Sequence, residues 1–300
     1  MRANISRFSS FIRAIHRGTT IPSLDSIHTV PLVHDLINTH SSNEAKDRSP
    51  IVMLHGLFGN KTSNRTLCKH LNKSTSRDVY SLDLRNHGDS PRAPNCDYAS
   101  MAADVGAWVQ RNVSKPPIIL GHSMGAKVAM LLALMEPKHC HMVVSLENAP
   151  IPTPPLTRFL RYLYAIERIV AKEKCTRDEA FQELRNVETD EGLVLFLMTL
   201  IKRNNDGYLS RLPLQILKNG LKRGFIEDWP LQTDTISYKG PALFIRGTLS
   251  SIMPDECIPV IGNFFPKFEL RDAVAGHNVT TDAAAECSEL ITDFISRNED

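Results

Sequence analysis

A serine stands between two glycines in the stretch Gly121-His122-Ser123-Met124-Gly125, where an apolar run gives way to a helical pattern. A sharp turn from a strand into a helix crowds its central residue, and small neighbours on either side relieve that crowding. Such a turn presents the Ser123 hydroxyl at the carboxyl edge of a sheet. Because a serine hydroxyl is a poor nucleophile at neutral pH, this chemistry also needs a base and an orienting acid.

The base is expected from a histidine at the same edge of the sheet, in the loop after the last strand. The chain has 11 histidines, and His277 lies just after the predicted strand 267–274. His139 and His141 instead fall between a helix and the next strand, which places them at the opposite edge. His277 is therefore the predicted base, and an ordinary solvated loop histidine is the alternative.

The acid is harder to assign. Chains of this type commonly carry it in a Gly-x-x-Asp pattern after a late strand, but Ser250 occupies that position here. A serine cannot stabilise an imidazolium as a carboxylate does. Glu147 ends the strand-like run 141–147 and is the first choice, with Asp255 in reserve. For either residue the alternative is an ordinary loop or capping acid.

An oxyanion site is the remaining requirement, because negative charge develops on the carbonyl oxygen that Ser123 attacks. Backbone N–H groups suit this task, since they are fixed in place before the reaction. The N–H of Leu57 follows a strand and a tight turn, and the N–H of Met124 directly follows the nucleophile. These two groups are the predicted oxyanion hole. A neighbouring loop with Arg85, His87 and Asp89 is interpreted as a structural polar network.

The elements that must position these residues follow a regular pattern. Apolar runs predict strands and amphipathic or apolar stretches predict helices, in alternation along the chain. We expect strands over 29–37, 50–56, 78–84, 116–121, 141–147, 240–247 and 267–274, and helices over 61–74, 97–112, 124–135 and 282–296. Alternating strands and helices predict an α/β fold with a mostly parallel central sheet and helices on both faces.

The alternation is lost over residues 151–235, where apolar residues follow helical spacing and no strand is evident. This region predicts a helical lid inserted into a core formed by residues 23–150 and 236–300. An insertion that enters at the carboxyl end of one strand would cover the edge where open α/β sheets bind ligands. A packing ornament on the flank of the sheet is the alternative.

The first 22 residues are basic and contain no acid. The arginines lie at positions 2, 7, 13 and 17, and the apolar residues Ile5, Phe8, Ile12 and Ile15 share one helical face. This composition predicts a mitochondrial transit peptide and a mitochondrial location. An amphipathic surface helix or a membrane-surface anchor is the alternative. The longest other apolar run, residues 193–201, is too short to span a bilayer, so no transmembrane protein is expected.

The composition is that of an ordinary globular protein. Of 300 residues, 42% are hydrophobic and 23% are charged, with a formal net charge of +2 and no basic stripe, which argues against nucleic-acid binding. The six cysteines show no paired spacing, which favours a reducing compartment over a disulfide framework. His139, Cys140 and His141 form an isolated cluster without a second ligand pair, so neither a metal nor a cofactor is expected.

Five segments together carry a family resemblance: HGLFGN (55–60), DLRNHGDSP (83–91), GHSMGAKVAM (121–130), SLENAPIP (145–152) and AGH (275–277). Over residues 50–300 the chain resembles the α/β-hydrolase superfamily. More narrowly, it resembles the mitochondrial group of abhydrolase-domain-containing protein 11 and the fungal ethanol acetyltransferases. That group implies a catalytic acid after the strand 141–147, which favours Glu147 over Asp255, although glutamate stands here where the fungal branch has aspartate.

The resemblance also implies an activity. The chain is expected to be a serine acyl-transfer enzyme that uses a small acyl substrate, acetyl-CoA or an ester, with an alcohol or water as acceptor. Attack by ethanol on the acyl-enzyme would give an acetate ester, and attack by water would make the protein an esterase or thioesterase. The alternatives are a hydrolase only, either a carboxylesterase, a thioesterase or a lipase, and a catalytically silent binding protein.

Overall fold

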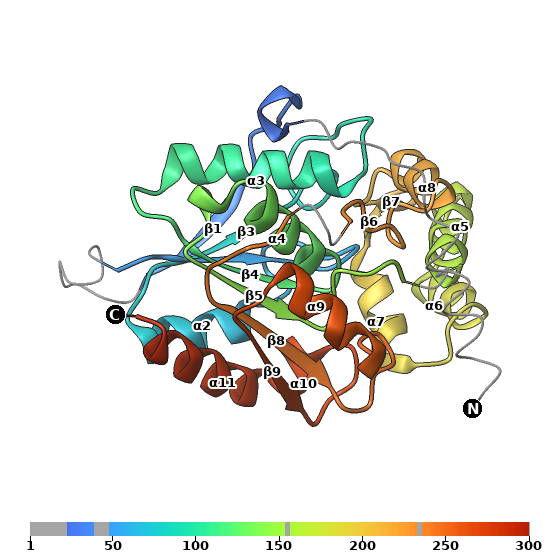
Figure 1. Ribbon diagram of the computed structural model, residues 1–300. Helices are drawn as coiled ribbons and strands as arrows, with labels where there is room; N and C mark the ends of the chain where they lie inside the picture. The colour runs from blue at the N-terminus through green and yellow to red at the C-terminus, as the bar shows by residue number, and fades with distance from the viewer. Residues whose placement is uncertain (1–22, 39–47, 154–156, 233–235, 300) are drawn as a thin grey trace.

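The computed structural model describes residues 23–38, 48–153, 157–232 and 236–299 (Figure 1). The predicted transit peptide, residues 1–22, lies outside the described residues. No helix of the described part of the chain combines the length and the apolar character needed to cross a membrane.

A central sheet organises the molecule. Within the described residues it has seven strands in the order β1-β3-β2-β4-β5-β8-β9. β1 pairs antiparallel with β3, and the other neighbours pair in parallel. The strands are β1 His34–Ile37, β2 Ile51–Leu54, β3 Val79–Leu82, β4 Ile118–His122, β5 Met142–Leu146, β8 Ala242–Gly247 and β9 Phe268–Ala273. Every residue of β2, β4 and β5 is buried, as expected for parallel strands covered on both faces.

Helices cover both faces of this sheet (Figure 1). One face packs against α2 Arg65–Thr75, α10 Val279–Asp282 and α11 Ala284–Arg297, and the other against α3 Tyr98–Asn112, α4 Met124–Met135 and α9 Ile258–Phe264. The described residues also form the short 3-10 helices η1 Leu24–Ser26, η3 Pro137–His139 and η4 Asp255–Cys257. The predicted α/β architecture, with a mostly parallel sheet between helical layers, is confirmed.

The segment between β5 and β8 lies at one end of the sheet (Figure 1). It contains α5 Arg158–Ala171, α6 Arg177–Arg185, α7 Glu191–Thr199, the hairpin β6 Ile201–Asn204 and β7 Gly207–Ser210, and α8 Leu214–Lys222. α6 begins at a capping box, in which the Thr176 hydroxyl accepts the Glu179 N–H and the Glu179 carboxylate accepts the Thr176 N–H.

The expectation that this segment holds no strand is wrong, because β6 and β7 form an antiparallel hairpin. The sequence hides β6, since Ile201 continues the apolar run of α7 and the next three residues are exposed and polar. A strand with this composition shows no alternation of apolar and polar residues. The hairpin is instead held by contacts made through the fold, with β7 packed against α5.

Candidate active site

Ser123 occupies the sharp turn between β4 and α4. Its backbone has φ 54° and ψ −114°, a region that residues with a Cβ atom rarely adopt. The Ser123 N–H donates to the carbonyl of Leu146 at 2.9 Å, and the Ser123 carbonyl accepts from the Ala126 N–H at 3.0 Å. The Asn148 side-chain amide donates to the same carbonyl at 3.0 Å. Hydrogen bonds from α4, from β5 and from the residue after Glu147 thus hold the strained turn at the nucleophile.

The glycines on either side of Ser123 are required by close backbone contacts. A Cβ atom on Gly121 would lie 2.1 Å from the carbonyl oxygen of Gly125, and a Cβ on Gly125 would lie 2.5 Å from that of Leu54. Both distances are far inside van der Waals contact. The prediction that these two glycines relieve crowding around the serine is confirmed.

The structure brings Ser123, His277 and Glu147 into one chain of hydrogen bonds. The Ser123 hydroxyl lies 2.9 Å from His277 Nε2, and His277 Nδ1 lies 3.0 Å from Glu147 Oε2. An acidic partner at Nδ1 selects the tautomer in which Nδ1 donates to Glu147 and Nε2 accepts from Ser123. This arrangement can deprotonate the serine hydroxyl and stabilise the imidazolium that results.

Glu147 reaches His277 from a fully buried position directly after β5. Its backbone has φ 59°, and its N–H donates to the Ile245 carbonyl at 2.9 Å. One carboxylate oxygen faces His277, and the other accepts the Gly247 N–H at 2.8 Å. The glutamate side chain thus spans from β5 to β8, and both of its oxygens have partners, as a buried carboxylate requires.

Asp255 lies away from this chain of hydrogen bonds. Its side chain is 83% exposed and pairs with Arg246 at 2.6 Å, and Arg246 also binds Asp272 at 2.8 Å. Ser250 stands where chains of this type commonly carry an aspartate, and its hydroxyl accepts the Ile252 N–H at 3.3 Å. Of the two candidate acids, the structure places Glu147 and not Asp255 beside His277.

His122 supports His277 from behind. His122 Nε2 donates to the main-chain carbonyl of His277 at 2.8 Å, and the two ring centroids are 5.2 Å apart. Burial lowers the pKa of His122 to about 4, so its imidazole is neutral around pH 7. Sequence reasoning missed this contact, although His122 stands immediately before the nucleophile, where a side chain can reach the loop that carries the base.

The two groups proposed for the oxyanion hole border the same site. Leu57 lines the pocket that contains Ser123 and lies in the turn that the Gly59 N–H closes onto the Gly56 carbonyl at 3.0 Å. The same Gly56 carbonyl accepts from His55 Nδ1 at 2.8 Å. His55 Nε2 accepts the N–H of Leu84 at 3.0 Å, which ties this segment to the loop after β3. Met124 is the first residue of α4. The first N–H groups of a helix have no partner within the helix, and such groups suit the binding of an anion.

A small pocket, of about 20 Å³, opens onto the serine. Its walls come from the sheet edge and from the segment between β5 and β8, namely Leu57, Ser123, Asn148, Thr153, Arg158, Phe159, Ile226, Ile252 and His277. The guanidinium of the exposed Arg158 lies over the Phe159 ring, 5.2 Å from its centroid. The pocket is therefore mainly apolar around the reacting groups, with a cation at its rim.

The loop after β3 forms a structural polar network, as predicted for Arg85, His87 and Asp89. The Arg85 guanidinium binds the buried Asp104 carboxylate at 2.6 Å, and His87 Nδ1 donates to the Arg85 carbonyl at 2.9 Å. Asp89 pairs with Lys61 at 2.5 Å. These side chains hold the loop together, and none of them lines the pocket at Ser123.

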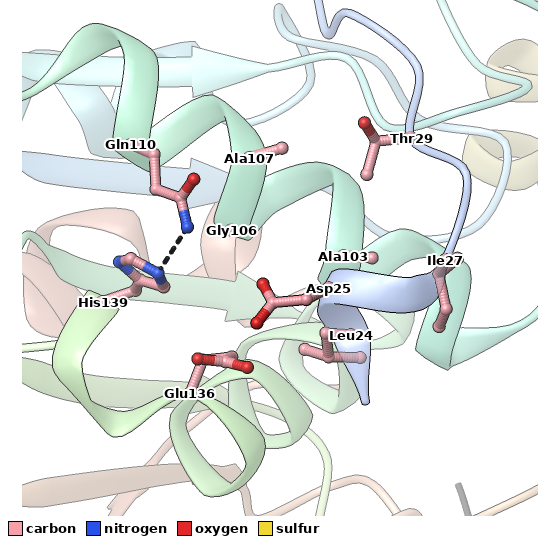
Figure 2. Close-up of a pocket in the computed structure, with 10 residues that line it drawn as sticks. All are labelled: Leu24, Asp25, Ile27, Thr29, Ala103, Gly106, Ala107, Gln110, Glu136 and His139. Atoms are coloured by element: carbon pink, nitrogen blue, oxygen red, sulfur yellow. Dashed lines mark hydrogen bonds between the residues drawn. The ribbon is translucent and has the colours of Figure 1, made fainter. Parts of the chain in front are cut away.

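A second pocket, of about 180 Å³, lies between η1, α3 and the end of α4 (Figure 2). His139 lies there, hydrogen-bonded to Gln110 at 2.9 Å. The thiol of the adjacent Cys140 is buried and donates to the Met142 carbonyl at 3.1 Å. In the described parts of the chain, no group of three or more His, Cys, Asp or Glu side chains is arranged to hold a metal.

Comparison with known proteins gives three kinds of match. The family model for the alpha/beta hydrolase fold matches residues 49–284. A Saccharomyces cerevisiae protein named "Probable alcohol acetyltransferase" is 42% identical over 288 residues, which cover 90% of this chain and 84% of that protein. A Xenopus laevis protein named "sn-1-specific diacylglycerol lipase ABHD11" is 33% identical over 251 residues, covering 82% of this chain and 79% of that protein. The solved structure "Marine microorganism esterase" is 26% identical with a TM-score of 0.76, covering 89% of this chain and all (100%) of that chain.

Proposed function

The chain belongs to the α/β-hydrolase family, and on that premise we propose that it transfers acyl groups through an ester formed on Ser123. The observation that carries this proposal is the continuous hydrogen-bond chain from Ser123 through His277 to Glu147. Such a chain has the geometry that general-base activation of a serine requires. Ser123 and His277 line a mainly apolar pocket, which supports an uncharged acyl group as substrate.

In the first half of the reaction, Ser123 Oγ attacks the carbonyl carbon of an ester or thioester and its proton passes to His277 Nε2. The carbonyl oxygen takes up negative charge and is held by the N–H groups of Leu57 and Met124. His277 then protonates the leaving alcohol or thiol, and the acyl group remains on Ser123. Glu147 orients the imidazole and stabilises its positive charge throughout.

In the second half, an acceptor hydroxyl gives its proton to His277 Nε2 and attacks the acyl-enzyme. We propose that acetyl-CoA supplies the acyl group and that a small alcohol such as ethanol is the main acceptor, with hydrolysis as a side reaction. The similarity to the yeast protein named as a probable alcohol acetyltransferase supports this choice. The apolar side chains around Ser123 also support it, because they favour an alkyl chain over water.

A direct assay tests this proposal. The full chain is incubated with acetyl-CoA with and without ethanol, and ethyl acetate, acetate and free CoA are measured for wild type and Ser123→Ala. We expect ethanol to speed consumption of acetyl-CoA and to yield ethyl acetate, and we expect Ser123→Ala to abolish both. Acetyl-CoA consumption that ethanol does not change, with acetate as the sole product, would contradict acetyl transfer.

Hydrolysis alone is the second candidate function. The amphibian relative is named as a diacylglycerol lipase, and the similar solved structure is that of an esterase. A hydrolase would release p-nitrophenol from p-nitrophenyl acetate at a rate independent of ethanol. A catalytically silent binding protein would neither hydrolyse p-nitrophenyl acetate nor form ethyl acetate, and it would not react with a fluorophosphonate probe.

We also propose that residues 1–22 direct the protein to mitochondria. Their four arginines and lack of acidic residues support this role. The test compares the location of a fluorescent fusion of the full chain with that of a fusion in which the four arginines are replaced by glutamine. Mitochondrial location of the first and loss of it in the second is the expected result, and a cytosolic location of both would contradict the proposal.

A further inference from the structure

The pocket at the nucleophile has room for a small group only. Its volume is about 20 Å³, and a single water molecule needs roughly 10–15 Å³ of such space. Ser123 lines the pocket, so an acyl group that forms an ester with its Oγ extends into this space. Beyond its carbonyl, an acetyl group has one methyl group, which is close to a water molecule in size. Each further methylene needs room that the walls have to supply.

One wall of the pocket is Phe159, near the start of α5. Its ring packs edge-to-face against Phe58, with the ring centroids 5.8 Å apart and the planes at 90°. It makes a similar contact with Tyr162, at 6.2 Å and 72°. The Arg158 guanidinium lies over the same ring, 5.2 Å from its centroid. A ring packed against these neighbours cannot turn aside for a longer acyl chain without breaking contacts.

The two rings that hold Phe159 are themselves fixed. Phe58 is buried, and it directly follows Leu57, which carries one of the N–H groups proposed for the oxyanion hole. Tyr162 is also buried, and its hydroxyl donates to the Glu188 carboxylate. These three aromatic residues connect the turn after β2 to the helical segment between β5 and β8. Phe159 is the member of this row that also lines the pocket.

The wall at Ile226 is held from behind. The Ile226 carbonyl accepts the Tyr98 hydroxyl at 3.0 Å, and Lys127 Nζ lies 3.5 Å from the same oxygen. Tyr98 belongs to α3 and Lys127 to α4, two helices of the layer on one face of the sheet. The main chain at Ile226 is thus tied to the core of the protein. A longer acyl group would have to displace packed side chains on either wall, which is unfavourable.

We propose that Phe159 limits the length of the acyl group that Ser123 accepts, and that it restricts the protein to short acyl groups such as acetyl and propionyl. This inference rests on the acyl-enzyme proposed above. A long acyl chain, like those of membrane lipids, would have to separate the Phe159 ring from Phe58 and Tyr162. Phe159 is a specificity-determining residue and takes no part in proton transfer. Its removal should therefore change which esters react and leave the chemistry at Ser123 in place.

The experiment measures kcat/KM for p-nitrophenyl acetate, butyrate and hexanoate with full-length wild type, Phe159→Ala and Phe181→Ala. Phe181 is the matched control, because it is a half-buried phenylalanine of α6 that does not line the pocket. We expect kcat/KM of wild type to fall about 10- to 100-fold from acetate to hexanoate, as overpacking of the pocket implies. Phe159→Ala should raise the hexanoate-to-acetate ratio about tenfold, and Phe181→Ala should leave it near the wild-type value.

The hexanoate-to-acetate ratio separates specificity from a structural role, because a smaller fraction of folded protein lowers both rates equally. If Phe159→Ala does not fold, Phe159→Leu, which opens part of the same space, is measured against Phe181→Leu. Wild type that hydrolyses hexanoate as efficiently as acetate, or Phe159 variants with the wild-type ratio, overturn the assignment of Phe159 alone. Wild type that releases no p-nitrophenol from any of the esters, with or without ethanol, overturns the acyl-enzyme on Ser123 as well.

Discussion

Lys127 is a lysine inside the protein, and its replacement by methionine gives a measurable change in how stability depends on pH. The residue lies in α4 and is fully buried. Its ammonium group is 2.9 Å from the Asp228 carbonyl, 3.4 Å from that of Glu227 and 3.5 Å from that of Ile226. It also lies 5.4 Å from the centroid of the Tyr98 ring. These contacts join α4, the helix after the nucleophile, to residues 226–228.

Burial lowers the pKa of Lys127 from 10.5 to about 7, against the opposing attraction of the Asp228 and Glu227 carboxylates. Between these two pH values the unfolded chain binds a proton that the folded protein does not. The free energy of unfolding therefore rises with pH in this window. With these pKa values the contribution of Lys127 grows by about 2.5 kcal/mol between pH 7.5 and pH 9.5.

The assay is urea unfolding at pH 7.5, 8.5 and 9.5, followed by tryptophan fluorescence, on wild type and Lys127→Met. The quantity of interest is the difference in unfolding free energy between the two proteins, because other titrating groups cancel in it. The exposed Lys69→Met variant is the matched control for loss of one lysine charge. A difference that stays constant from pH 7.5 to 9.5 would show that Lys127 keeps its proton in the folded protein, and would refute the reasoning.

Three further results are expected. Glu147→Gln removes the negative charge behind His277 and should slow hydrolysis of p-nitrophenyl acetate by roughly 10³- to 10⁴-fold, whereas Asp255→Asn should stay within about twofold of wild type. Equal losses in the two variants would count against the assignment of the acid. Gly125→Ala brings a Cβ to 2.5 Å from the Leu54 carbonyl, so its unfolding free energy should be lower by about 2–3 kcal/mol, and wild-type stability in urea would contradict this. Burial lowers the pKa of three histidines, to about 4 for His55 and His122 and to about 3 for His87. The unfolded chain takes up protons below pH 6.5 that these residues do not, so urea midpoints should fall from pH 6.5 toward pH 4, and constant midpoints would contradict it.

The place of the reacting groups could be predicted from the sequence because each follows a recognisable strand. Ser123 comes after β4, Glu147 after β5 and His277 after β9. The carboxyl ends of parallel strands meet at one edge of a sheet, so residues separated by more than a hundred positions are brought together by topology. The regular alternation of strands and helices was sufficient to place that edge.

The contacts that complete the site depend on distances that no local pattern contains. The reach of Glu147 depends on the spacing between β5 and β8, where Gly247 holds its second oxygen. Asp255 pairs instead with Arg246 of β8, and its side chain is exposed. The bond from His122 to the His277 carbonyl joins residues 155 positions apart. Each of these requires the folded backbone, because a side chain and its partner come from different strands or loops.

The most direct test of the central claim is labelling of the full chain with a fluorophosphonate probe, followed by mass-spectrometric mapping of the modified residue. The proposed hydrogen-bond chain predicts modification at Ser123 alone, none in Ser123→Ala, and much slower labelling in Glu147→Gln than in Asp255→Asn. Wild-type protein that stays unlabelled, or that is modified at another serine, would contradict the account.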